Sequence, residues 1–494
     1  MKVLLVNPRF PLTFWNFRYT LELVGKKCAY PPLGLLTIAP LLPKEWERRL
    51  VDEEVRKLTQ EDIDWADIIL ATAMLPQKHR LREIVGQCRA AGKRILLGGP
   101  FLSTTKEEFP EADHIFLGEA EESLPQFVKD LASNNTKRVY QGSDSIPLSV
   151  VPVPDYSLIN FRDYSGISIQ YSRGCPHNCE FCDIPVIYGN LPRIKSNAQF
   201  LQELEAVRKL GYKGPIFIVD DNFIGNKKGA RTLLPDLVSW QKRHKYPFSF
   251  FTEATVLLAD DIPLMELMAA AIFERVFLGI ETPVQESLVE TQKYQNTKRS
   301  MQDSIREIQA YGMEVMAGFI VGFDNDPPDF VKLQIDFIED SAIPLAMVGL
   351  LGALLGTPLW NRLEKEGRLL GEVTDAILNA ELNFKPIMDR NVLTDGYKEI
   401  VRSIYTPRAY YNRILRCLSR LPRHIPKSSN GLTVKENLAS LRHIVEKLGF
   451  DDEGEKEFRK FFVRVLIKYP NRIAQALRLA GQGYHIRRVF EANF

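Results

Sequence analysis

Three of the six cysteines lie close together, in the run YSRGCPHNCEFCDIPVIYG. Cys175, Cys179 and Cys182 have the spacing Cys-x3-Cys-x2-Cys and follow a short stretch that favours a strand. A loop of this size can place three thiolates on three irons of a [4Fe–4S] cube and leave the fourth iron without a protein ligand. The spacing therefore predicts an iron–sulfur cluster with one iron open to a further molecule.

A zinc site and chance are the alternatives for this spacing. Zinc would need a fourth Cys or His at similar spacing, and His177 lies between the first two cysteines, where it is poorly placed to complete a tetrahedron. Random placement of six cysteines would give the pattern in on the order of one chain in a thousand. The remaining Cys28, Cys88 and Cys417 are scattered and are predicted to be buried free thiols. This use of cysteine indicates a reducing compartment, the cytoplasm.

The motif resembles that of the radical S-adenosylmethionine (SAM) superfamily. The resemblance implies that the open iron binds SAM and passes one electron to its sulfonium. It also implies that SAM is held by the aromatic residue before the third cysteine and by carboxylates at strand ends: Phe181, Asp220, Asp221, Glu253 and Glu281. The Gly-Gly-Glu run usual in the superfamily is absent, and Asp220–Asp221 stands in its place. A role as helix N-caps is the alternative for these carboxylates.

Two series of strands and helices must position these residues. In residues 1–141, continuous apolar runs alternate with helical patterns, which is typical of a doubly wound, Rossmann-like parallel sheet in an α/β fold. The predicted strands are 2–8, 49–52, 67–74, 94–100 and the first part of 114–131. Residues 142–165 contain several prolines and little periodicity, and are predicted to be a linker.

Residues 166–380 contain the second series, in which helices separate six predicted strands. These strands are 168–172, 216–221, 250–255, 275–282, 314–323 and 347–354. Parallel strands with helical crossovers predict a partial (β/α)6 barrel, whose active site faces the carboxyl ends of the strands. Residues 381–494 carry apolar stripes at helical spacing and are predicted to form a helical C-terminal domain.

A doubly wound domain directly before such a barrel resembles the cobalamin-binding subgroup of the superfamily. The resemblance implies that residues at its strand ends cradle the corrin and its nucleotide tail: Thr72, Gln77, Gly98, Gly99, Pro100, Gly118 and Glu119. Glycines let a strand edge approach a flat macrocycle closely. The Asp-x-His-x-x-Gly run that supplies a lower cobalt ligand in other cobalamin domains is absent, and only His79 and His114 occur in this domain. A domain without cofactor is the alternative.

Further segments, among them CDIPVIYGNLPRIK, VDDNFIGNKK and LLGTPLWNRLEKEGRLL, resemble the family that contains the bacterial hopanoid C-2 methylases. The resemblance implies a cobalamin-dependent C-methyltransferase that transfers methyl from methylcobalamin to an unactivated carbon of a hydrophobic, hopanoid- or tetrapyrrole-like substrate. No residue is assigned as a general acid or base, because such radical chemistry does not require one. A flavodoxin- or ferredoxin-type protein is the expected electron donor. The alternatives are a non-methylating radical SAM enzyme, such as a cyclase or oxidase, and a non-enzymatic iron–sulfur sensor.

The formal net charge of +2 gives no reason to expect a nucleic-acid partner. Residues 398–494 nevertheless hold 20 Lys and Arg against 9 Asp and Glu. Within them, residues 458–490 alternate apolar residues with Arg and Lys around Pro470, which fits either peripheral membrane contact or a core-facing helix pair with basic outer faces. We expect no signal peptide, and no membrane span at the uncharged stretch 343–360, because prolines and glycines interrupt it. The expected location is the cytoplasm, with membrane association as an open alternative.

Overall fold

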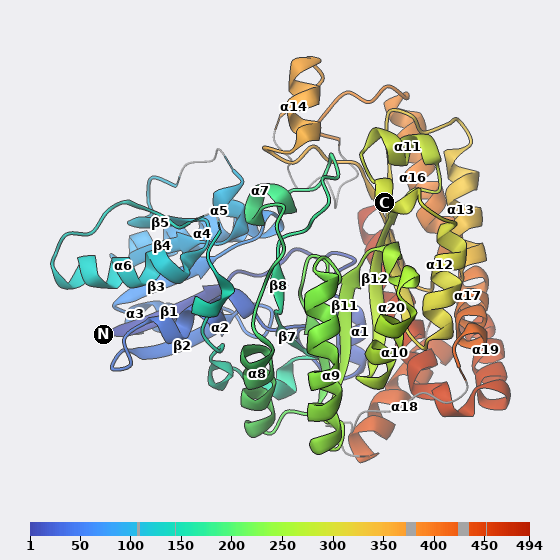
Figure 1. Ribbon diagram of the computed structural model, residues 1–494, viewed down its shortest axis with the longest axis horizontal. Helices are drawn as coiled ribbons and strands as arrows, with labels where there is room; N and C mark the ends of the chain where they lie inside the picture. Colours follow the sequence, from blue (N-terminus) through green and yellow to red (C-terminus); the bar gives the residue numbers. More distant parts are fainter. Residues whose placement is uncertain (106–108, 144, 372–381, 423–433, 451) are drawn as a thin grey trace. The chain divides into compact units, whose positions relative to one another are not determined.

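The computed structural model describes residues 1–494 except 106–108, 144, 372–381, 423–433 and 451 (Figure 1). The chain divides into two compact units. Unit 1 comprises Met1–Pro11, Lys27–Pro176 and Asp183–Tyr212, and unit 2 comprises Leu12–Lys26, His177–Cys182 and Lys213–Phe494. The boundary predicted between residues 380 and 381 lies outside the described residues.

Unit 1 is built on a parallel sheet with the strand order β2-β1-β3-β4-β5-β6. The strands are β1 (Lys2–Asn7), β2 (Glu47–Asp52), β3 (Ile68–Thr72), β4 (Arg94–Gly98), β5 (His114–Leu117) and β6 (Val139–Gln141). Every ladder of this sheet is parallel, and the strand order reverses beside β1. The sheet is therefore doubly wound, as predicted.

The two faces of this sheet are covered by different helices, because successive side chains of a strand point to opposite faces. Leu4 of β1 enters a core with Ile84 of α4 (Lys78–Ala90), whereas its neighbour Leu5 enters a second core with Phe127 of α6 (Ala120–Ala132). The other helices of the unit are α2 (Leu33–Ile38), α3 (Gln60–Trp65), α5 (Pro100–Ser103), α7 (Ile184–Tyr188) and α8 (Asn197–Lys209).

The segment that leads to the cysteines differs from the prediction. The strand predicted over 168–172 is two strands, β7 (Ile167–Ile169) and β8 (Ser172–Arg173). They are separate because β8 pairs antiparallel with β9 (Arg193–Ile194), with Ser172 opposite Ile194. The predicted linker 142–165 contains three 3-10 turns: η3 (Leu148–Val150), η4 (Tyr156–Leu158) and η5 (Phe161–Asp163).

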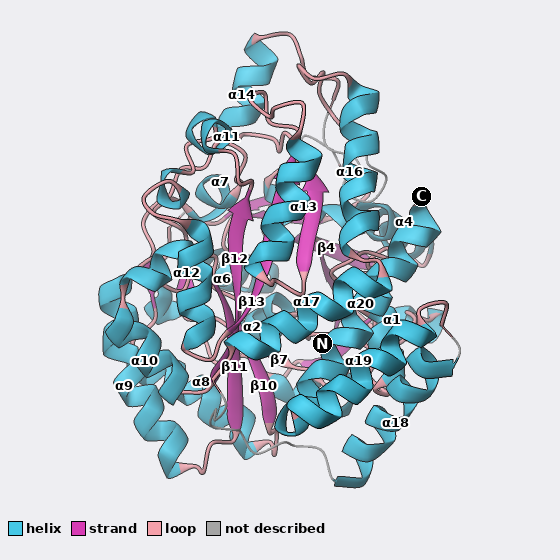
Figure 2. Ribbon diagram, turned by 90° about the vertical axis from the view of Figure 1, so that its right-hand side faces the viewer, coloured by secondary structure: helices cyan, strands magenta, loops and turns pink. Residues whose placement is uncertain are grey.

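Unit 2 contains a second sheet, in which the strands of this unit have the order β14-β13-β12-β11-β10. They are β10 (Gly214–Ile218), β11 (Phe248–Ala254), β12 (Phe273–Glu281), β13 (Glu314–Val321) and β14 (Ala346–Leu350). The ladders from β10 to β14 are parallel and follow chain order, and β10 to β13 lie side by side in Figure 2. Helices cross between these strands: α9 (Lys227–Arg243), α10 (Ile262–Ala270), α11 (Gln285–Glu290), α12 (Met301–Ala310) and α13 (Phe330–Ser341). This topology is the partial (β/α) barrel that was predicted.

The described residues after β14 are helical, as predicted for the C-terminal part. The helices are α14 (Pro358–Lys365), α16 (Arg390–Ile404), α17 (Pro407–Arg420), α18 (Val434–Phe450), α19 (Glu455–Lys468) and α20 (Ile473–Asn493). Pro470 lies in η8 (Pro470–Arg472), which separates α19 from α20. No helix within the described ranges has the length and apolar character needed to cross a membrane.

A helix from the beginning of the chain belongs to unit 2. α1 (Arg18–Leu23) packs against α20, and Thr20 Oγ1 donates a hydrogen bond to the Gly481 carbonyl at 2.8 Å. His485 of α20 donates from Nε2 to the Thr13 carbonyl at 2.9 Å, and its Nδ1 accepts from the Tyr19 N–H at 3.4 Å. The segment 12–26 is thus part of the C-terminal helical bundle, an arrangement that the sequence did not predict.

Candidate active site

The three clustered cysteines lie in the loop between β8 and α7. Cys179 is buried, and Cys175 and Cys182 are half-buried. The Cys182 N–H donates to the Cys179 carbonyl at 3.1 Å, which tightens the loop between the second and third cysteines. Gly174, directly before the loop, has φ of 91°, and a Cβ there would lie 2.9 Å from the Gly189 carbonyl oxygen. Only glycine fits the entry to this loop.

Long-range hydrogen bonds within unit 2 hold the cysteine loop. The Glu180 N–H donates to the Thr291 carbonyl and the Glu180 carbonyl accepts from the Leu359 N–H, both at 2.9 Å. Gln295 Nε2 donates to Cys179 Sγ at 3.4 Å. Both the backbone of the loop and one thiol are therefore positioned by residues more than a hundred positions away in the chain, which local spacing could not reveal.

The Glu180 carboxylate lies in a network of ion pairs. Arg362 of α14 donates from Nε and Nη2 to its two oxygens, at 2.6 and 3.0 Å. Arg362 Nη1 donates to Asp324 at 2.8 Å, and Arg368 donates to the same carboxylate at 2.6 and 2.8 Å. Burial opposes ionisation of Asp324, but Arg368 and Arg362 together lower its pKa. The bidentate guanidinium of Arg362 thus fixes Glu180, which lies between the predicted cluster ligands Cys179 and Cys182.

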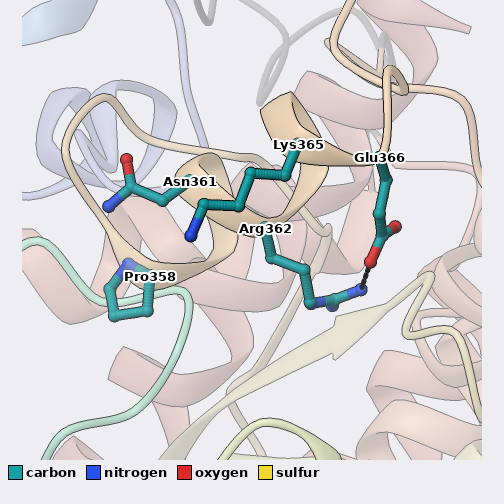
Figure 3. Close-up of a pocket in the computed structure, with 5 residues that line it drawn as sticks. All are labelled: Pro358, Asn361, Arg362, Lys365 and Glu366. Carbon is teal, nitrogen blue, oxygen red and sulfur yellow. Dashed lines mark hydrogen bonds and ion pairs between the residues drawn. The ribbon is translucent and has the colours of Figure 1, made fainter.

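Arg362 also lines a surface hollow of α14, drawn in Figure 3. The other lining residues are Pro358, Asn361, Lys365 and Glu366. Glu366 lies 3.4 Å from Arg362 Nη1, on the solvent side of the network. None of the predicted site residues lines this hollow, so it is separate from the candidate active site.

A buried ammonium group accompanies the cysteine loop. Lys293 Nζ lies 2.6 Å from Glu281 Oε1 and 5.8 Å from the centroid of the Phe181 ring. Burial opposes the charge of Lys293, but the Glu281 carboxylate and the thiols of Cys179 and Cys182 raise its pKa. Glu281 and Phe181, both predicted from the sequence, are thus brought together by a lysine that the prediction missed.

The backbone of β12 is irregular where Glu281 ends the strand. The register with β13 shifts between Gly279 and Glu281, and Glu281 has a left-handed φ of 64°. Asn296 Nδ2 donates to the carbonyls of Gly279 and Ile280 at 2.9 and 3.0 Å, and Gln334 Nε2 donates to the Glu281 carbonyl at 3.2 Å. Bulges and strained residues of this kind concentrate at functional sites, where they re-aim a side chain. Here the irregular strand end presents Glu281 to Lys293.

Three predicted carboxylates gather at the ends of two neighbouring strands. Asp220 and Asp221 follow β10, and Glu253 lies near the end of β11. Burial, and after it the charges of Asp221 and Asp220, raise the pKa of Glu253 to about 8. At neutral pH the protonated Glu253 can donate one hydrogen bond while the aspartates accept. This set matches the needs of an ammonium group or ribose hydroxyls.

The predicted residues of unit 1 end three neighbouring strands. Thr72 ends β3 opposite Gly98 of β4, Gly118 follows β5, and Pro100 begins α5. Gly99 has φ of 104°, and a Cβ there would lie 2.3 Å from Thr72 Oγ1. The glycine lets the end of β4 pass close to the end of β3.

Gln77 makes hydrogen bonds within unit 1. Its buried Nε2 donates to Asn7 Oδ1 at 3.1 Å and to the Pro8 carbonyl, and its Oε1 accepts from the Met74 N–H at 2.8 Å. These bonds tie the ends of β1 and β3 together.

Glu119 also has protein partners. It accepts from both Nη atoms of Arg193 at 2.8 Å, lies 3.2 Å from Arg173 Nη1, and accepts from the Ile146 N–H at 3.0 Å. Burial opposes its ionisation, but Arg193 and Arg173 lower the pKa of Glu119. Because Arg173 belongs to β8 and Arg193 to β9, Glu119 anchors the two strands that bracket the cysteine loop.

Family models match two parts of the chain. Residues 169–334 match the radical SAM superfamily, and residues 357–493 match a domain of unknown function (DUF4070). The first match contains the three clustered cysteines and the ends of β10, β11 and β12.

Solved structures with a similar fold include two enzymes with cobalamin bound. The cobalamin-dependent SAM radical enzyme OxsB, with aqua-cobalamin and SAM bound, aligns with a TM-score of 0.63 at 16% identity, over 99% of this chain and 83% of its own. The radical SAM methyltransferase TsrM from Kitasatospora setae, with cobalamin and a [4Fe–4S] cluster bound, aligns at 0.59 and 15% identity, over 99% of each chain. At this identity the likeness concerns the fold, which is the predicted one.

Two curated proteins resemble the chain over nearly its whole length. An uncharacterized methyltransferase of Synechocystis sp. is 42% identical over 98% of this chain and 91% of its own. The hopanoid C-2 methylase of Rhodopseudomonas palustris is 35% identical over 94% of this chain and 90% of its own. The chain therefore belongs to the radical SAM superfamily, in the family that includes this hopanoid methylase.

Proposed function

We propose that the protein is a cobalamin-dependent radical SAM methyltransferase that methylates an unactivated carbon of a hydrophobic substrate. The observation that carries the proposal is the three-cysteine loop, which residues of unit 2 hold through hydrogen bonds to Glu180 and Cys179. This loop lies in a chain that is 35% identical to a hopanoid C-2 methylase over 94% of its length. When bound, the cluster supplies one electron for SAM cleavage, and cobalamin supplies the methyl group.

The residues present fit a [4Fe–4S] cluster held by Cys175, Cys179 and Cys182. Gln295 donates to one thiol and the Lys293 ammonium carries positive charge beside two of them, so both would stabilise thiolates. In the described part of the chain, no three His, Cys, Asp or Glu side chains converge on one point as ligands of a single ion would. A cube does not need this convergence, because each thiolate binds its own iron.

The proposed SAM contacts divide into an aromatic and a polar group. Phe181 would pack on the adenine, while Asp220 and Asp221 accept bonds from the methionyl ammonium. Glu253, protonated at neutral pH, would donate to a ribose oxygen or to the SAM carboxylate. Glu281 acts with Lys293, whose ammonium can pair with a SAM carboxylate as well as with Glu281.

The residues of unit 1 would serve cobalamin either by contacting the corrin directly or by supporting the sheet edge that contacts it. Thr72 and the glycines Gly98 and Gly118 would contact the corrin from three adjoining strand ends. Gly99 and Pro100 shape that edge. Gln77 and Glu119 support it indirectly, since their side chains already bind the protein: Gln77 between β1 and β3, Glu119 with the arginines beside the cysteine loop.

Anaerobic reconstitution tests this proposal. Protein loaded with iron and sulfide should cleave SAM to 5′-deoxyadenosine under dithionite, and should retain a corrin spectrum after incubation with hydroxocobalamin. Cys179→Ser should lose the iron and the cleavage, whereas Cys28→Ser, which keeps a hydroxyl donor to the Tyr30 carbonyl, should keep both. Retained cleavage without any bound corrin would overturn methylation from cobalamin and leave a non-methylating radical SAM enzyme.

Substrate and partners follow from the same proposal. A hopanoid- or tetrapyrrole-like substrate is largely apolar, so we propose that the protein binds it at a membrane surface through its basic C-terminal part.

A flavodoxin- or ferredoxin-type protein would supply the electron. Measuring dithionite-free SAM cleavage with a reduced flavodoxin tests the donor, and no turnover above the protein-free control would exclude it.

A further inference from the structure

Helix α19 has apolar side chains on two opposite faces. Phe458, Phe461 and Val465 are buried on the side that packs against α17, and Figure 2 shows α19 beside α17 and α20. Val463, Leu466 and Ile467 are 53%, 44% and 74% exposed. At 100° per residue, these three residues are centred on the face opposite the buried one. A surface helix needs only its inner stripe to be apolar, so the outer stripe calls for a separate explanation.

The charge of this outer face is positive. The acidic residues of α19, Glu455 and Glu457, are confined to its first turn, where they pair with Arg459 and Lys460 at 2.7 and 2.8 Å. Beyond that turn the helix carries Arg464 and Lys468, both exposed, and within the described ranges neither forms an ion pair. At 100° per residue they lie about 60° and 100° beyond Ile467, along one side of the apolar stripe. Unpaired positive charge therefore lies beside the exposed apolar side chains.

An exposed aromatic side chain extends this surface. Phe450, the last residue of α18, is exposed and packs beneath the guanidinium of Arg459, whose Cζ lies 5.1 Å from the ring centroid. An apolar body next to a cationic head is the combination that residues at a lipid–water interface use.

We propose that the outer face of α19, together with Phe450, binds the surface of an anionic phospholipid bilayer. At 14 residues the helix is too short to span a bilayer, so it lies in the interface. Its apolar stripe enters the acyl boundary while Arg464 and Lys468 contact lipid phosphates. This inference rests on the proposed function and deepens it. An enzyme that methylates an apolar substrate has a reason to bind the membrane in which that substrate dissolves.

Vesicle flotation of the full-length holoenzyme tests the proposal. Protein should co-float with phosphatidylcholine vesicles that contain about one third phosphatidylglycerol, and much less with pure phosphatidylcholine. Val463→Glu should lower the partition coefficient about tenfold. The matched control is Val392→Glu, since Val392 of α16 is also a helical valine that is 53% exposed, and this variant should bind as the wild type does. Arg464→Glu with Lys468→Glu should lower binding to the anionic vesicles alone.

Three outcomes would overturn the proposal: no flotation of the wild type, equal loss in Val463→Glu and Val392→Glu, or equal binding to both kinds of vesicle. Concentration-dependent dimers that Val463→Glu abolishes, without vesicle binding, would assign the face to a second copy instead. SAM cleavage by the same preparations, measured without lipid, separates this failure from a failure of the proposed function, because substitutions on the outer face of α19 should leave that activity unchanged.

Discussion

At the scale of single residues, the raised pKa of Glu253 has a consequence for stability. Because its folded-state pKa of about 8 exceeds the unfolded value near 4.3, the folded protein binds the proton more tightly. The free energy of unfolding should therefore fall as the pH rises from about 5 to 8. Glu253→Gln should remove this fall and be more stable than the wild type above pH 8, by on the order of 2 kcal/mol.

Denaturant unfolding of the protein without SAM, at a series of pH values, measures the effect of Glu253→Gln. Glu266→Gln serves as the control, because Glu266 is an exposed carboxylate of α10 and its substitution should leave the pH profile unchanged. A wild-type profile that is flat over this range would show that neither burial nor the charges of Asp221 and Asp220 raise the pKa of Glu253 in the folded protein.

Arg362 should decide how firmly the cysteine loop holds its cluster. Arg362→Gln leaves the Glu180 carboxylate, which is 7% exposed, without its bidentate partner inside the loop. An unpaired buried charge is costly, so the loop should shift to hydrate it. We expect the reconstituted variant to lose its visible cluster absorbance several-fold faster in the presence of a chelator.

Arg442→Gln provides the matched comparison for Arg362. Arg442 forms only an exposed pair with Glu446 one turn away on α18, so its loss should not change cluster lifetime. Equal lifetimes for wild type and Arg362→Gln would mean that the network around Glu180 has no part in holding the loop.

The candidate site could be predicted where its residues follow a local rule. The cysteines are recognisable from their spacing, and Asp220, Asp221 and Glu253 from their places after apolar runs. Lys293, Gln295 and Arg362 could not be found in this way, because they reach the loop from more than a hundred residues away and only the folded chain brings them there. The roles of the predicted ligands stay predictions until the reconstitution experiments are done.

At the scale of elements, long apolar runs made the parallel strands predictable, because a strand buried on both faces has little polar interruption. The same rule failed at 168–172, where antiparallel pairing with β9 splits the run into β7 and β8. The sequence analysis also did not predict α3, although Thr59 and Asp62 form a capping box at its start. The docking of α1 on α20 had no local signal, since it joins residues more than 450 positions apart.

His485 makes that docking sensitive to acid. Burial lowers its pKa to about 4, and the neutral ring is required because Nδ1 accepts from Tyr19 while Nε2 donates to Thr13. The unfolded histidine binds a proton below about pH 6.5, so stability should fall as the pH drops from 6.5 to 4, by up to about 3 kcal/mol. We expect proteolysis of the segment 12–26 to accelerate over this range.

His485→Gln tests the link between charge and docking, because its amide can donate and accept without gaining a proton. Its rate of proteolysis should change little between pH 6.5 and 4. His443→Gln, at an exposed site on α18, should keep the acid response of the wild type. An identical response in both variants would place the acid sensitivity elsewhere.

At the scale of the whole molecule, one fully buried guanidinium joins the barrel of unit 2 to its helical bundle. Arg413 of α17 is fully buried and donates to the carbonyls of Ile343 and Ile404 at 2.7 and 2.8 Å, to the Pro344 carbonyl at 3.2 Å, and to the Glu339 carboxylate. Ile343 and Pro344 lie directly before β14, and Glu339 lies in α13. One side chain therefore satisfies polar groups of the last barrel crossover and of the bundle at once.

Arg413→Leu should lower the free energy of unfolding by about 3–5 kcal/mol, because it leaves three buried carbonyls without this donor and leaves the Glu339 carboxylate paired with Arg416 alone. Since these groups belong to both parts of unit 2, we expect the bundle to unfold before the barrel in the variant. The helical signal in circular dichroism and the tryptophan fluorescence, to which Trp240 of the barrel helix α9 contributes, should then no longer change together. Arg416→Leu is the control: Arg416 pairs with the same Glu339 but is 46% exposed, and its loss should cost less than about 1 kcal/mol. A single coincident transition of Arg413→Leu at wild-type stability would show that this guanidinium does not couple the bundle to the barrel.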